Sequence, residues 1–322
     1  MSIQEKIFKD YQTFEAQQKY LQEPQTLYAP INYVLALGGK KVRPVLTCLA
    51  HEAGGGTSSN IHKLAYALEL FHNFTLLHDD VMDHAEQRRG KATVHKKWDV
   101  ATAILSGDEM LIQTCMLINE VELASGQAFM AEFLNMASEV CRGQQSDMDF
   151  EKRDDVSLDE YIEMIRKKTA VLLAIAIKFG GRLAGVDSET QELLYEYGTS
   201  AGVGFQMMDD YLDTYGDSSF GKRIGGDILE DKKTWLYIKA LQLASTGQKA
   251  VLANWHGTTK DEDAKIETVR SIYSDLGVDK LIVSEINKQF EHADTLLADI
   301  KGQMPNIGVL SDYLNRLAKR TT

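Results

Sequence analysis

The distribution of proline is the feature that most constrains this fold. The chain of 322 residues has four prolines, and none of them lies between residues 45 and 304. Proline interrupts the hydrogen bonds of a helix interior, so this gap permits long, unbroken helices. Apolar residues recur with helical spacing at Ile61, Leu64, Leu68 and Phe71. No strand-like alternation with hairpin turns is visible, so the sequence predicts an all-α fold with about ten or more helices of ordinary length.

Glycine-rich stretches mark the expected loops. They occur at residues 53–60, 180–187, 216–226 and 256–263. No linker of disordered composition divides the chain, and its 44% hydrophobic content suffices for a large core. We therefore expect a single domain that spans residues 1–322.

Charge and hydropathy exclude several classes of protein. The net charge is −12, from 35 basic and 47 acidic residues, which argues against nucleic-acid binding. The three cysteines are widely spaced, as is typical of a protein from a reducing compartment. The first twelve residues are too polar for a signal peptide, and the longest apolar run, residues 170–177, is too short to cross a bilayer. We expect a cytoplasmic protein with no transmembrane segment.

Two copies of one acidic motif, DDxxD, indicate the chemistry. They are DDVMD at residues 79–83 and DDYLD at residues 209–213. On a helix, the first and last aspartates of each copy lie one turn apart on the same face, where like charges repel. Hard divalent cations would offset that repulsion, because Mg²⁺ binds carboxylate oxygens together with substrate phosphates. A single such motif is more often a solvated acidic turn, but two facing clusters would hold several metal ions around one polyphosphate.

Cationic side chains accompany the acidic motifs. Arg88 and Arg89 follow the first motif, and their planar guanidinium groups suit phosphate oxygens. Lys40 and Arg43 follow the pair Gly38-Gly39, in a segment that lacks the spacing of a Walker A loop. This segment is a candidate for binding a diphosphate directly, without a metal ion.

Further candidates lie near the second motif. Lys222 and Lys232 belong to a glycine-bounded basic stretch that suits a loop closing over phosphate, or an ordinary solvated loop. Lys168 precedes Thr169 at the start of the longest apolar run. This lysine has a functional role, or it simply extends from a buried helix to solvent. Gln206 lies one turn before Asp209, and its amide oxygen suits either a developing cation or the helix surface.

Taken together, these motifs resemble those of the trans-isoprenyl diphosphate synthases, also called polyprenyl synthetases. In chain order they are GGKKVRP, His72, DDVMD with Arg88-Arg89-Gly90, GQQSD at residues 143–147, Lys168-Thr169, GFQMMDDYLD and GKRIGGDILEDKKTWL. The resemblance runs from about residue 35 to residue 240, and it is close to the short-chain members, which make geranylgeranyl or farnesyl diphosphate. One departure is Lys41, where the family more usually has arginine.

The resemblance implies a fold, an activity and roles for individual residues. The implied fold is that of the isoprenoid synthases, with antiparallel helices around a central active-site cavity, assembled as a homodimer. The implied reaction joins isopentenyl diphosphate to an allylic diphosphate with three Mg²⁺ ions per active site. The metal ligands would be Asp79, Asp83 and Asp209, supported by Asp80, Asp210 and Asp213. The allylic diphosphate would contact Arg88, Lys168, Lys222 and Lys232, isopentenyl diphosphate would contact Lys40, Arg43, His72 and Arg89, and the allylic cation would face Thr169 and Gln206.

The residues before the first motif bear on the length of the product. In the family, bulky side chains upstream of that motif form the floor of the elongation cavity. Here Phe74 and Phe71 are aromatic and Thr75 is small, which resembles synthases that make C20 or C15 products, with C20 favoured. An ideal helix places Phe74 roughly 140° from Asp79, so the resemblance alone nominates it. The alternative is that both aromatic rings belong to the ordinary core.

Three other functions compete with a stand-alone synthase. A class I terpene cyclase shares the fold and the first motif, but it normally carries a different second metal motif. A non-catalytic partner subunit of a heteromeric synthase usually loses acidic motifs, whereas both are intact here. A helical scaffold with acidic surface turns leaves the order and spacing of the motifs unexplained.

Overall fold

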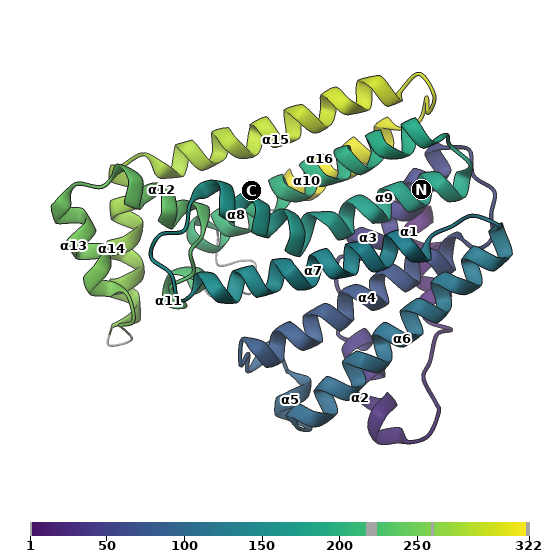
Figure 1. Cartoon of the computed structure of the whole chain (residues 1–322), viewed down its shortest axis with the longest axis horizontal. Coiled ribbons are helices and arrows are strands. Elements are labelled where there is room, and N and C mark those ends of the chain that lie inside the picture. Colours follow the sequence, from purple (N-terminus) through teal and green to yellow (C-terminus); the bar gives the residue numbers. More distant parts are fainter. Residues whose placement is uncertain (1, 217–223, 259–260, 320–322) are drawn as a thin grey trace. The chain divides into compact units, whose positions relative to one another are not determined.

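A computed structural model describes residues 2–216, 224–258 and 261–319, and it confirms the all-α prediction (Figure 1). One helical run contains a short π-helical segment, η1, between two α-helices. The elements are α1 (Ile3–Glu15), α2 (Gln25–Ala36), α3 (Val42–Ala53), α4 (Ile61–Met82), β1 (Gln87–Arg88), β2 (Lys91–Ala92), α5 (Val94–Lys97), α6 (Val100–Ser125), α7 (Met130–Phe150), α8 (Leu158–Ile165), η1 (Arg166–Ala170), α9 (Val171–Ala184), α10 (Ser188–Tyr215), α11 (Gly226–Leu229), α12 (Trp235–Leu243), α13 (Thr246–Trp255), α14 (Glu262–Asp275), α15 (Val278–Ile300) and α16 (Gly308–Lys319).

A small hairpin, β1–β2, interrupts the helices and was not expected from the sequence. Arg88 pairs with Lys91 across its antiparallel strands. The two turn residues, Arg89 and Gly90, both have positive φ, at 54° and 72°. Two-residue hairpin turns favour this geometry, but their usual sequence signal is Asn-Gly or Asp-Gly. The Arg-Gly pair lacks that signal, so the expectation that the chain has no hairpin was wrong at this point.

The helices gather into two compact units. Unit 1 comprises Met1–Asn135, Ile175–Leu194 and Lys301–Leu310, and unit 2 comprises Met136–Ala174, Tyr195–Ile300 and Ser311–Thr322. The expectation of a single domain over residues 1–322 stays a prediction.

In unit 1, α4 packs against both α3 and α6. The buried face of α4 includes Leu68 and Phe71, and α6 contributes Met110 and Ile118, all at most 1% exposed. The helix α6 is bounded by recognisable signals. The Asp99 side chain caps its first turn by accepting a hydrogen bond from the Thr102 N–H at 2.8 Å, and Gly126 ends it with a φ of 71°.

The pair Gly180-Gly181 does not begin a loop, which corrects the sequence-based expectation. The helix α9 continues to Ala184, and both glycines lie inside it. A Cβ on Gly180 would lie 3.0 Å from the Ala50 Cβ and closer still to the Thr47 carbonyl oxygen. These glycines therefore permit close packing between helices, and here tertiary contact outweighs the low helix propensity of glycine.

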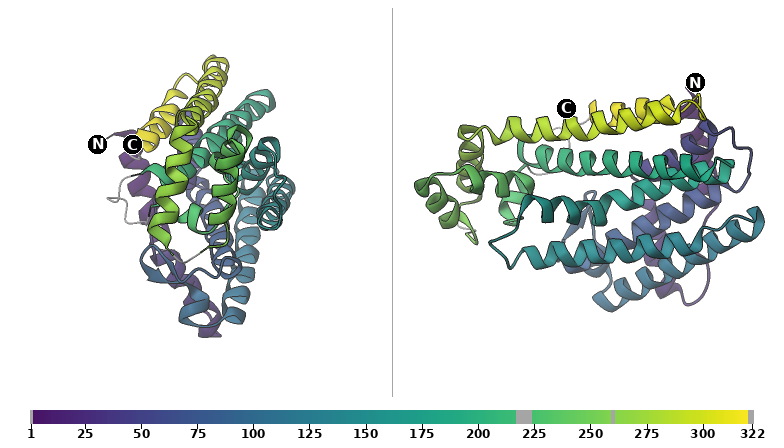
Figure 2. Two further views of the ribbon diagram at one scale, coloured as in Figure 1. Left: turned by 90° about the vertical axis from the view of Figure 1, so that its left-hand side faces the viewer. Right: turned by 45° about the horizontal axis from the view of Figure 1, so that its top comes forward.

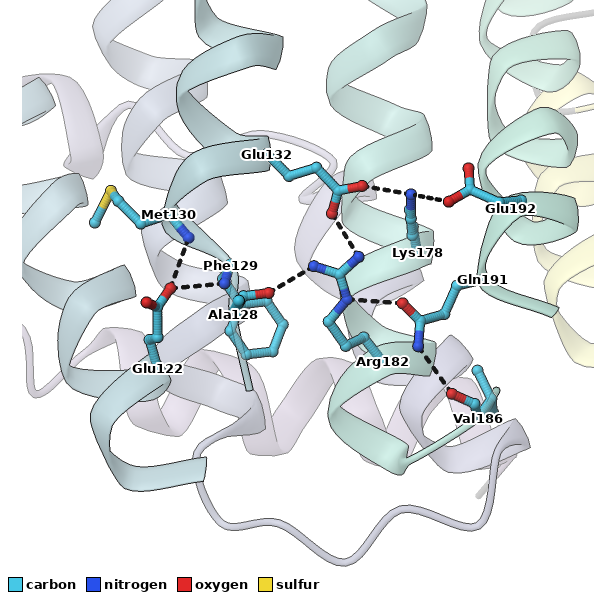
Figure 3. Close-up of polar contacts among 10 residues, drawn as sticks. All are labelled: Glu122, Ala128, Phe129, Met130, Glu132, Lys178, Arg182, Val186, Gln191 and Glu192. Atoms are coloured by element: carbon cyan, nitrogen blue, oxygen red, sulfur yellow. Dashed lines mark hydrogen bonds and ion pairs between the residues drawn. The ribbon is translucent and has the colours of Figure 1, made fainter. Parts of the chain in front are cut away.

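A buried ionic network ties α9 to the starts of α7 and α10 within unit 1 (Figure 3). The Lys178 ammonium, with its side chain 4% exposed, lies 2.5 Å from Glu132 and 2.7 Å from Glu192. The Arg182 guanidinium contacts Glu132 and also donates hydrogen bonds to Gln191 and to the Ala128 carbonyl. Each buried cation thus has an anionic partner, as burial of charge requires.

Unit 2 has its own core. It is formed by the end of α7 and by α8, η1, α10, α11, α12, α13, α14 and α15, with Tyr161, Met207, Trp235 and Ile282 among its buried residues. The long helix α15 runs beside α10 (Figure 2). Phe205 and Phe290 meet edge to face with ring centroids 5.6 Å apart, which fixes the two helices against one another.

The helix α6 is distinctive among the described residues. By length and composition alone, it is the one helix there that is long and apolar enough to cross a membrane, and 33% of its apolar window is buried. Its exposed apolar side chains include Leu105, Ile112, Met116 and Leu123, which are 52–77% exposed. Their spacing of seven, four and seven residues places them on one face of the helix.

Candidate active site

The first DDxxD motif lies at the C-terminal end of α4. Asp79 and Asp80 belong to its last turn, and Asp83 is the residue that ends it, with its N–H bonded to the Asp79 carbonyl at 2.8 Å. The helix dipole places partial negative charge at this end, so three carboxylates there are electrostatically unfavourable. Bound cations would relieve that repulsion.

The second aspartate of this motif has a different environment from the other two. Asp80 is 5% exposed, whereas Asp79 is half-buried and Asp83 is exposed. The Arg88 Nε lies 2.9 Å from both Asp80 oxygens, and its Nη2 lies 2.8 Å from Oδ1. Burial raises the pKa of Asp80, and Arg88 opposes that shift. Asp80 thus orients Arg88, while Asp79 and Asp83 face more solvent.

The hairpin brings Arg89 to the glycine pair that precedes α3. Its Nη1 donates a hydrogen bond to the Gly38 carbonyl. A Cβ on Gly39 would lie 2.8–3.0 Å from the guanidinium, so a larger residue would displace the Arg89 side chain, and the φ of 139° at this position itself favours glycine. The predicted phosphate-binding residues Arg89 and Lys40 therefore belong to neighbouring segments, and Lys40 is exposed.

His72 lies in a strongly positive environment in unit 1. Burial lowers its pKa well below the usual value, and the nearby cations Arg43, Arg89 and Arg88 lower it further. Four residues that the sequence nominated for diphosphate binding therefore influence one another electrostatically. A cluster of cations around a neutral imidazole is suited to an anionic ligand.

Lys41, adjacent to these residues, has a structural role. Its side chain is 5% exposed and lies 2.8 Å from Glu15 and 3.2 Å from Glu69. Its φ of 49° places it in the left-handed region at the start of α3. The lysine that replaces the family's usual arginine is therefore directed into the interior of unit 1.

The residues nominated for chain length form an aromatic cluster on α4. Phe71 lies 5.5 Å from Phe74 and 5.2 Å from Phe133 between ring centroids. Phe74 also contacts the His78 ring at 4.7 Å, while the Thr75 hydroxyl donates to the His72 carbonyl at 2.8 Å. Phe71 is 1% exposed and Phe74 is half-buried, so a role as the floor of a cavity stays a prediction.

The second DDxxD motif repeats this pattern in unit 2, at the C-terminal end of α10. Asp209 is exposed and Asp213 is half-buried, whereas Asp210 is only 6% exposed. The Asp213 Oδ2 accepts the Asp227 N–H at 2.9 Å, and its carbonyl accepts the Gly225 N–H at 2.6 Å. The motif therefore also fixes the start of the following segment.

Asp210 is the centre of a hydrogen-bonded chain. Its Oδ2 accepts the Tyr161 hydroxyl at 2.5 Å, and its Oδ1 accepts the Gln206 Nε2 at 3.0 Å. The Gln206 Oε1 in turn accepts the Thr169 hydroxyl at 3.0 Å. Burial, followed by the charge of Asp227, raises the pKa of Asp210, while the bonds from Tyr161 and Gln206 lower it. The predicted cation-facing residues Gln206 and Thr169 are thus directly linked.

The π-helical turn η1 carries Lys168 and Thr169. Local π-helical geometry often marks functional sites. The Lys168 Nζ lies 2.6 Å from Asp147, which belongs to the GQQSD segment of α7. A Cβ on Gly143 would lie only 2.8 Å from the Lys168 Cα, so glycine permits the backbone of α7 to approach this turn closely.

Lys232 lies beside two acidic residues of the segment that follows α10. Its Nζ is 3.0 Å from Glu230 and 3.5 Å from Asp227. Burial, which outweighs the opposing charge of Lys232, raises the pKa of Asp227 to about 6. Lys222, the other lysine nominated in this segment, lies outside the described residues.

The carboxylates of these motifs fit Mg²⁺ that is shared with a phosphate ligand. Within residues 2–216, 224–258 and 261–319, no three His, Cys, Asp or Glu side chains gather into a ready-made metal cage. Mg²⁺ commonly binds through one or two carboxylates, several waters and substrate phosphates, so such a cage is not required. Asp79, Asp83 and Asp209 provide hard oxygen donors at helix ends that disfavour negative charge.

Comparison with known proteins decides the family. The family model described as polyprenyl synthetase matches residues 24–276. This chain belongs to the polyprenyl synthetase family. As a family member it is a trans-prenyltransferase of the short-chain type with the isoprenoid synthase fold. Its sequence is 39% identical over 277 residues to a geranylgeranyl diphosphate synthase of Methanosarcina mazei, and the match covers 85% of each chain.

Solved structures agree with this assignment of the prenyltransferase. A crystal structure of a geranylgeranyl pyrophosphate synthase superposes with a TM-score of 0.91 at 40% identity and covers 100% of both chains. A polyprenyl synthase from Caulobacter crescentus, complexed with calcium and isoprenyl diphosphate, has a TM-score of 0.86 at 26% identity and covers 99% of this chain and 96% of that one.

Sequence reasoning missed some residues that organise the site of this prenyltransferase. Tyr161 and Asp227 both contact the second acidic motif but lie outside DDxxD. Tyr161 lies in the core of unit 2, and nothing in the sequence indicates the partner of its hydroxyl. Asp227 belongs to the GKRIGGD segment, so its neighbourhood was recognised although its contact was not.

Proposed function

We propose that this trans-prenyltransferase joins isopentenyl diphosphate head-to-tail to allylic diphosphates of C5, C10 and C15. We propose a C20 product, geranylgeranyl diphosphate, ahead of C15. The names of the Methanosarcina relative and of the superposed crystal structure support the C20 product. The half-buried ring of Phe74, on the helix that carries the first motif, is compatible with a floor that limits elongation.

The observation that most supports this proposal is that the two acidic motifs have the same arrangement. Each ends a long helix, and in each the second aspartate is buried in hydrogen bonds while the first is more accessible. We propose that Asp79, Asp83 and Asp209 bind Mg²⁺, with Asp80, Asp210 and Asp213 in support. When bound, Mg²⁺ would neutralise the diphosphate that leaves the allylic substrate. The complex of the Caulobacter relative with calcium and isoprenyl diphosphate supports a divalent-cation site.

The cationic residues divide between the two substrates. We assign Lys40, Arg43, His72 and Arg89 to isopentenyl diphosphate, because cations dominate the surroundings of His72 in unit 1. We assign Arg88, Lys168 and Lys232 to the allylic diphosphate. The guanidinium of Arg88 is already oriented by Asp80, and the ammonium of Lys168 by Asp147. Groups held in place before the substrate arrives lose less entropy on binding.

The reaction needs no protein nucleophile. The allylic C–O bond breaks, the double bond of isopentenyl diphosphate attacks the resulting cation, and a proton is then lost to the departing pyrophosphate. Thr169 and Gln206 would present oxygens to the cation. Lys168 would hold pyrophosphate as its charge develops, which favours ionisation.

We propose that the enzyme is a homodimer that uses the apolar face of α6. Leu105, Ile112, Met116 and Leu123 form a stripe that is costly to leave in water. A second copy of the chain offers the same apolar stripe, and a two-fold interface pairs one surface patch with its own copy. Light scattering after size-exclusion chromatography tests this proposal, and a monomer at micromolar concentration would refute it.

The elongation assay tests the proposed activity. The purified protein is incubated with Mg²⁺, isopentenyl diphosphate and, in separate reactions, the C5, C10 or C15 allylic diphosphate. The products are dephosphorylated, and their length is read by mass spectrometry. We expect one main product of C20 from every primer. A discrete C15 product would overturn the chain-length proposal alone, while no elongation by the folded protein would overturn the stand-alone synthase and favour a partner-subunit role.

A further inference from the structure

The hydroxyl of Tyr161 lies at the end of a directional chain of hydrogen bonds in unit 2. Tyr161 donates to Asp210 at 2.5 Å, Gln206 donates to Asp210 at 3.0 Å, and Thr169 donates to Gln206 at 3.0 Å. Tyr161 and Gln206 both donate to Asp210, so the bonds converge on its carboxylate, and the single hydroxyl proton of Thr169 is used on Gln206. The chain therefore fixes where the last hydrogen atom, on Thr169, points.

The chain joins two helical segments at two points. Tyr161 and Thr169 belong to the continuous run α8–η1, and Gln206 and Asp210 lie one turn apart on α10. Tyr161 is 2% exposed and packs in the core of unit 2. Its ring therefore has little freedom to move. The hydroxyl consequently holds the Asp210 carboxylate in one position.

The orientation of the Gln206 amide follows from this arrangement. The amide nitrogen of Gln206 faces Asp210 and its amide oxygen faces Thr169, which is the orientation that a carboxylate favours because it accepts hydrogen bonds and does not donate them. The Thr169 hydroxyl then uses its proton on Gln206 and keeps only lone pairs for other neighbours. If the amide flipped, its nitrogen would donate to Thr169, and the hydroxyl proton would be free to point at a substrate cation.

We propose that Tyr161 is a positioning residue of the prenyltransferase, which holds Asp210 so that Gln206 and Thr169 keep their oxygen lone pairs directed at the allylic cation. The inference rests on the proposed function of Gln206 and Thr169. Tyr161 does not touch substrate in this account, and it acts only through Asp210. Its role is therefore electrostatic orientation of the groups that face the developing charge.

The variant Tyr161→Phe tests this role, because it removes one hydroxyl and keeps the buried ring. We expect kcat to fall about tenfold, which is the effect of one misdirected polar group, while the KM for isopentenyl diphosphate changes less than about twofold. Tyr197→Phe is the matched control, since Tyr197 is also buried, at 1% exposed, and lies on α10 outside this series of hydrogen bonds. Equal losses of kcat in both variants would overturn the proposal.

A double variant separates positioning from a general structural effect. If Tyr161 acts through Gln206, adding Tyr161→Phe to Gln206→Leu should lower kcat by less than about twofold, because the linked residues are not additive. A further tenfold loss in the Gln206→Leu background would show that Tyr161 acts independently, and it would overturn the proposal.

A crystal structure of the metal-free Tyr161→Phe protein provides a test that is independent of activity. We expect the bond between Thr169 and Gln206 to break or the amide to occupy two orientations, whereas the Tyr197→Phe structure keeps the wild-type arrangement. An unchanged Gln206 in the Tyr161→Phe structure would overturn the positioning role. If the wild-type enzyme itself failed to elongate any primer, the proposed function would fall, while this structural test would still decide whether Tyr161 orients Gln206.

Discussion

The network around Lys178 gives a quantitative prediction of stability. In Glu132→Ala, the buried ammonium of Lys178 loses its contact at 2.5 Å with Glu132 and keeps its contact with Glu192, whose side chain is 65% exposed. Removal of one partner of a buried ion pair typically costs 3–5 kcal/mol. Because Glu132 is itself 33% exposed and one carboxylate remains, we expect the free energy of unfolding to fall by about 2–3 kcal/mol.

The same network supplies matched controls. Glu192→Ala removes a mostly solvated partner, so its cost should be about 0–1 kcal/mol. Lys178→Met removes the buried charge, keeps an apolar side chain of similar length and leaves Glu132 with Arg182 as an ionic partner, so its cost should be below that of Glu132→Ala. In the Lys178→Met background, Glu132→Ala should cost about 1–2 kcal/mol less than in the wild type.

Urea denaturation followed by circular dichroism at neutral pH measures these values, with the slope of the transition checked for each variant. The double-mutant cycle is the decisive comparison. If the costs of Glu132→Ala and Lys178→Met add to within about 0.5 kcal/mol, Lys178 and Glu132 do not stabilise one another, and the reasoning from buried charge is refuted.

Three further predictions follow from the structure. Burial lowers the pKa of His51 to about 4, so the unfolded state takes up a proton first as the pH falls below about 6.5; between about pH 8 and pH 5 the wild type should lose about 2 kcal/mol more stability than His51→Gln, and equal slopes in a pH series of denaturation curves would contradict this. Phe74→Ala should lengthen the main product by about one isoprene unit, because it removes a half-buried ring; an unchanged product by mass spectrometry would remove Phe74 as the floor. Leu123→Glu should convert the proposed dimer into monomer, because Leu123 is 77% exposed on the apolar face of α6, and light scattering that still shows a dimer would exclude that face.

Much of the fold was accessible from the sequence because its signals are local. The proline-free stretch and the periodicity that leads into Asp79 predicted long helices, and the structure has them. The glycine pair at residues 180–181 was wrongly predicted to begin a loop, because glycine marks both loops and close helix packing. Only the tertiary contact with Ala50 distinguishes the two. The hairpin at residues 87–92 was missed because its turn residues are Arg89 and Gly90.

The same distinction between local signals and tertiary contacts applies to the candidate site. The aspartates of both motifs could be nominated from spacing, since helical geometry fixes which of them share a face. The different environments of Asp80 and Asp210 could not, because they depend on contacts with Arg88, which a hairpin folds back onto its motif, and with Tyr161, which is distant in sequence. Hydrogen-bond direction and burial are tertiary properties, and they distinguish the roles of residues that look alike in a motif.

The stoichiometry of the reaction tests the central claim most directly. Wild-type enzyme, Mg²⁺, an allylic diphosphate and labelled isopentenyl diphosphate are combined, and released pyrophosphate is measured together with label incorporated into longer chains. A prenyltransferase that condenses the two substrates should release one pyrophosphate for each isopentenyl unit incorporated, and none when isopentenyl diphosphate is omitted. Pyrophosphate release without incorporation, or neither product from the folded protein, would contradict the account.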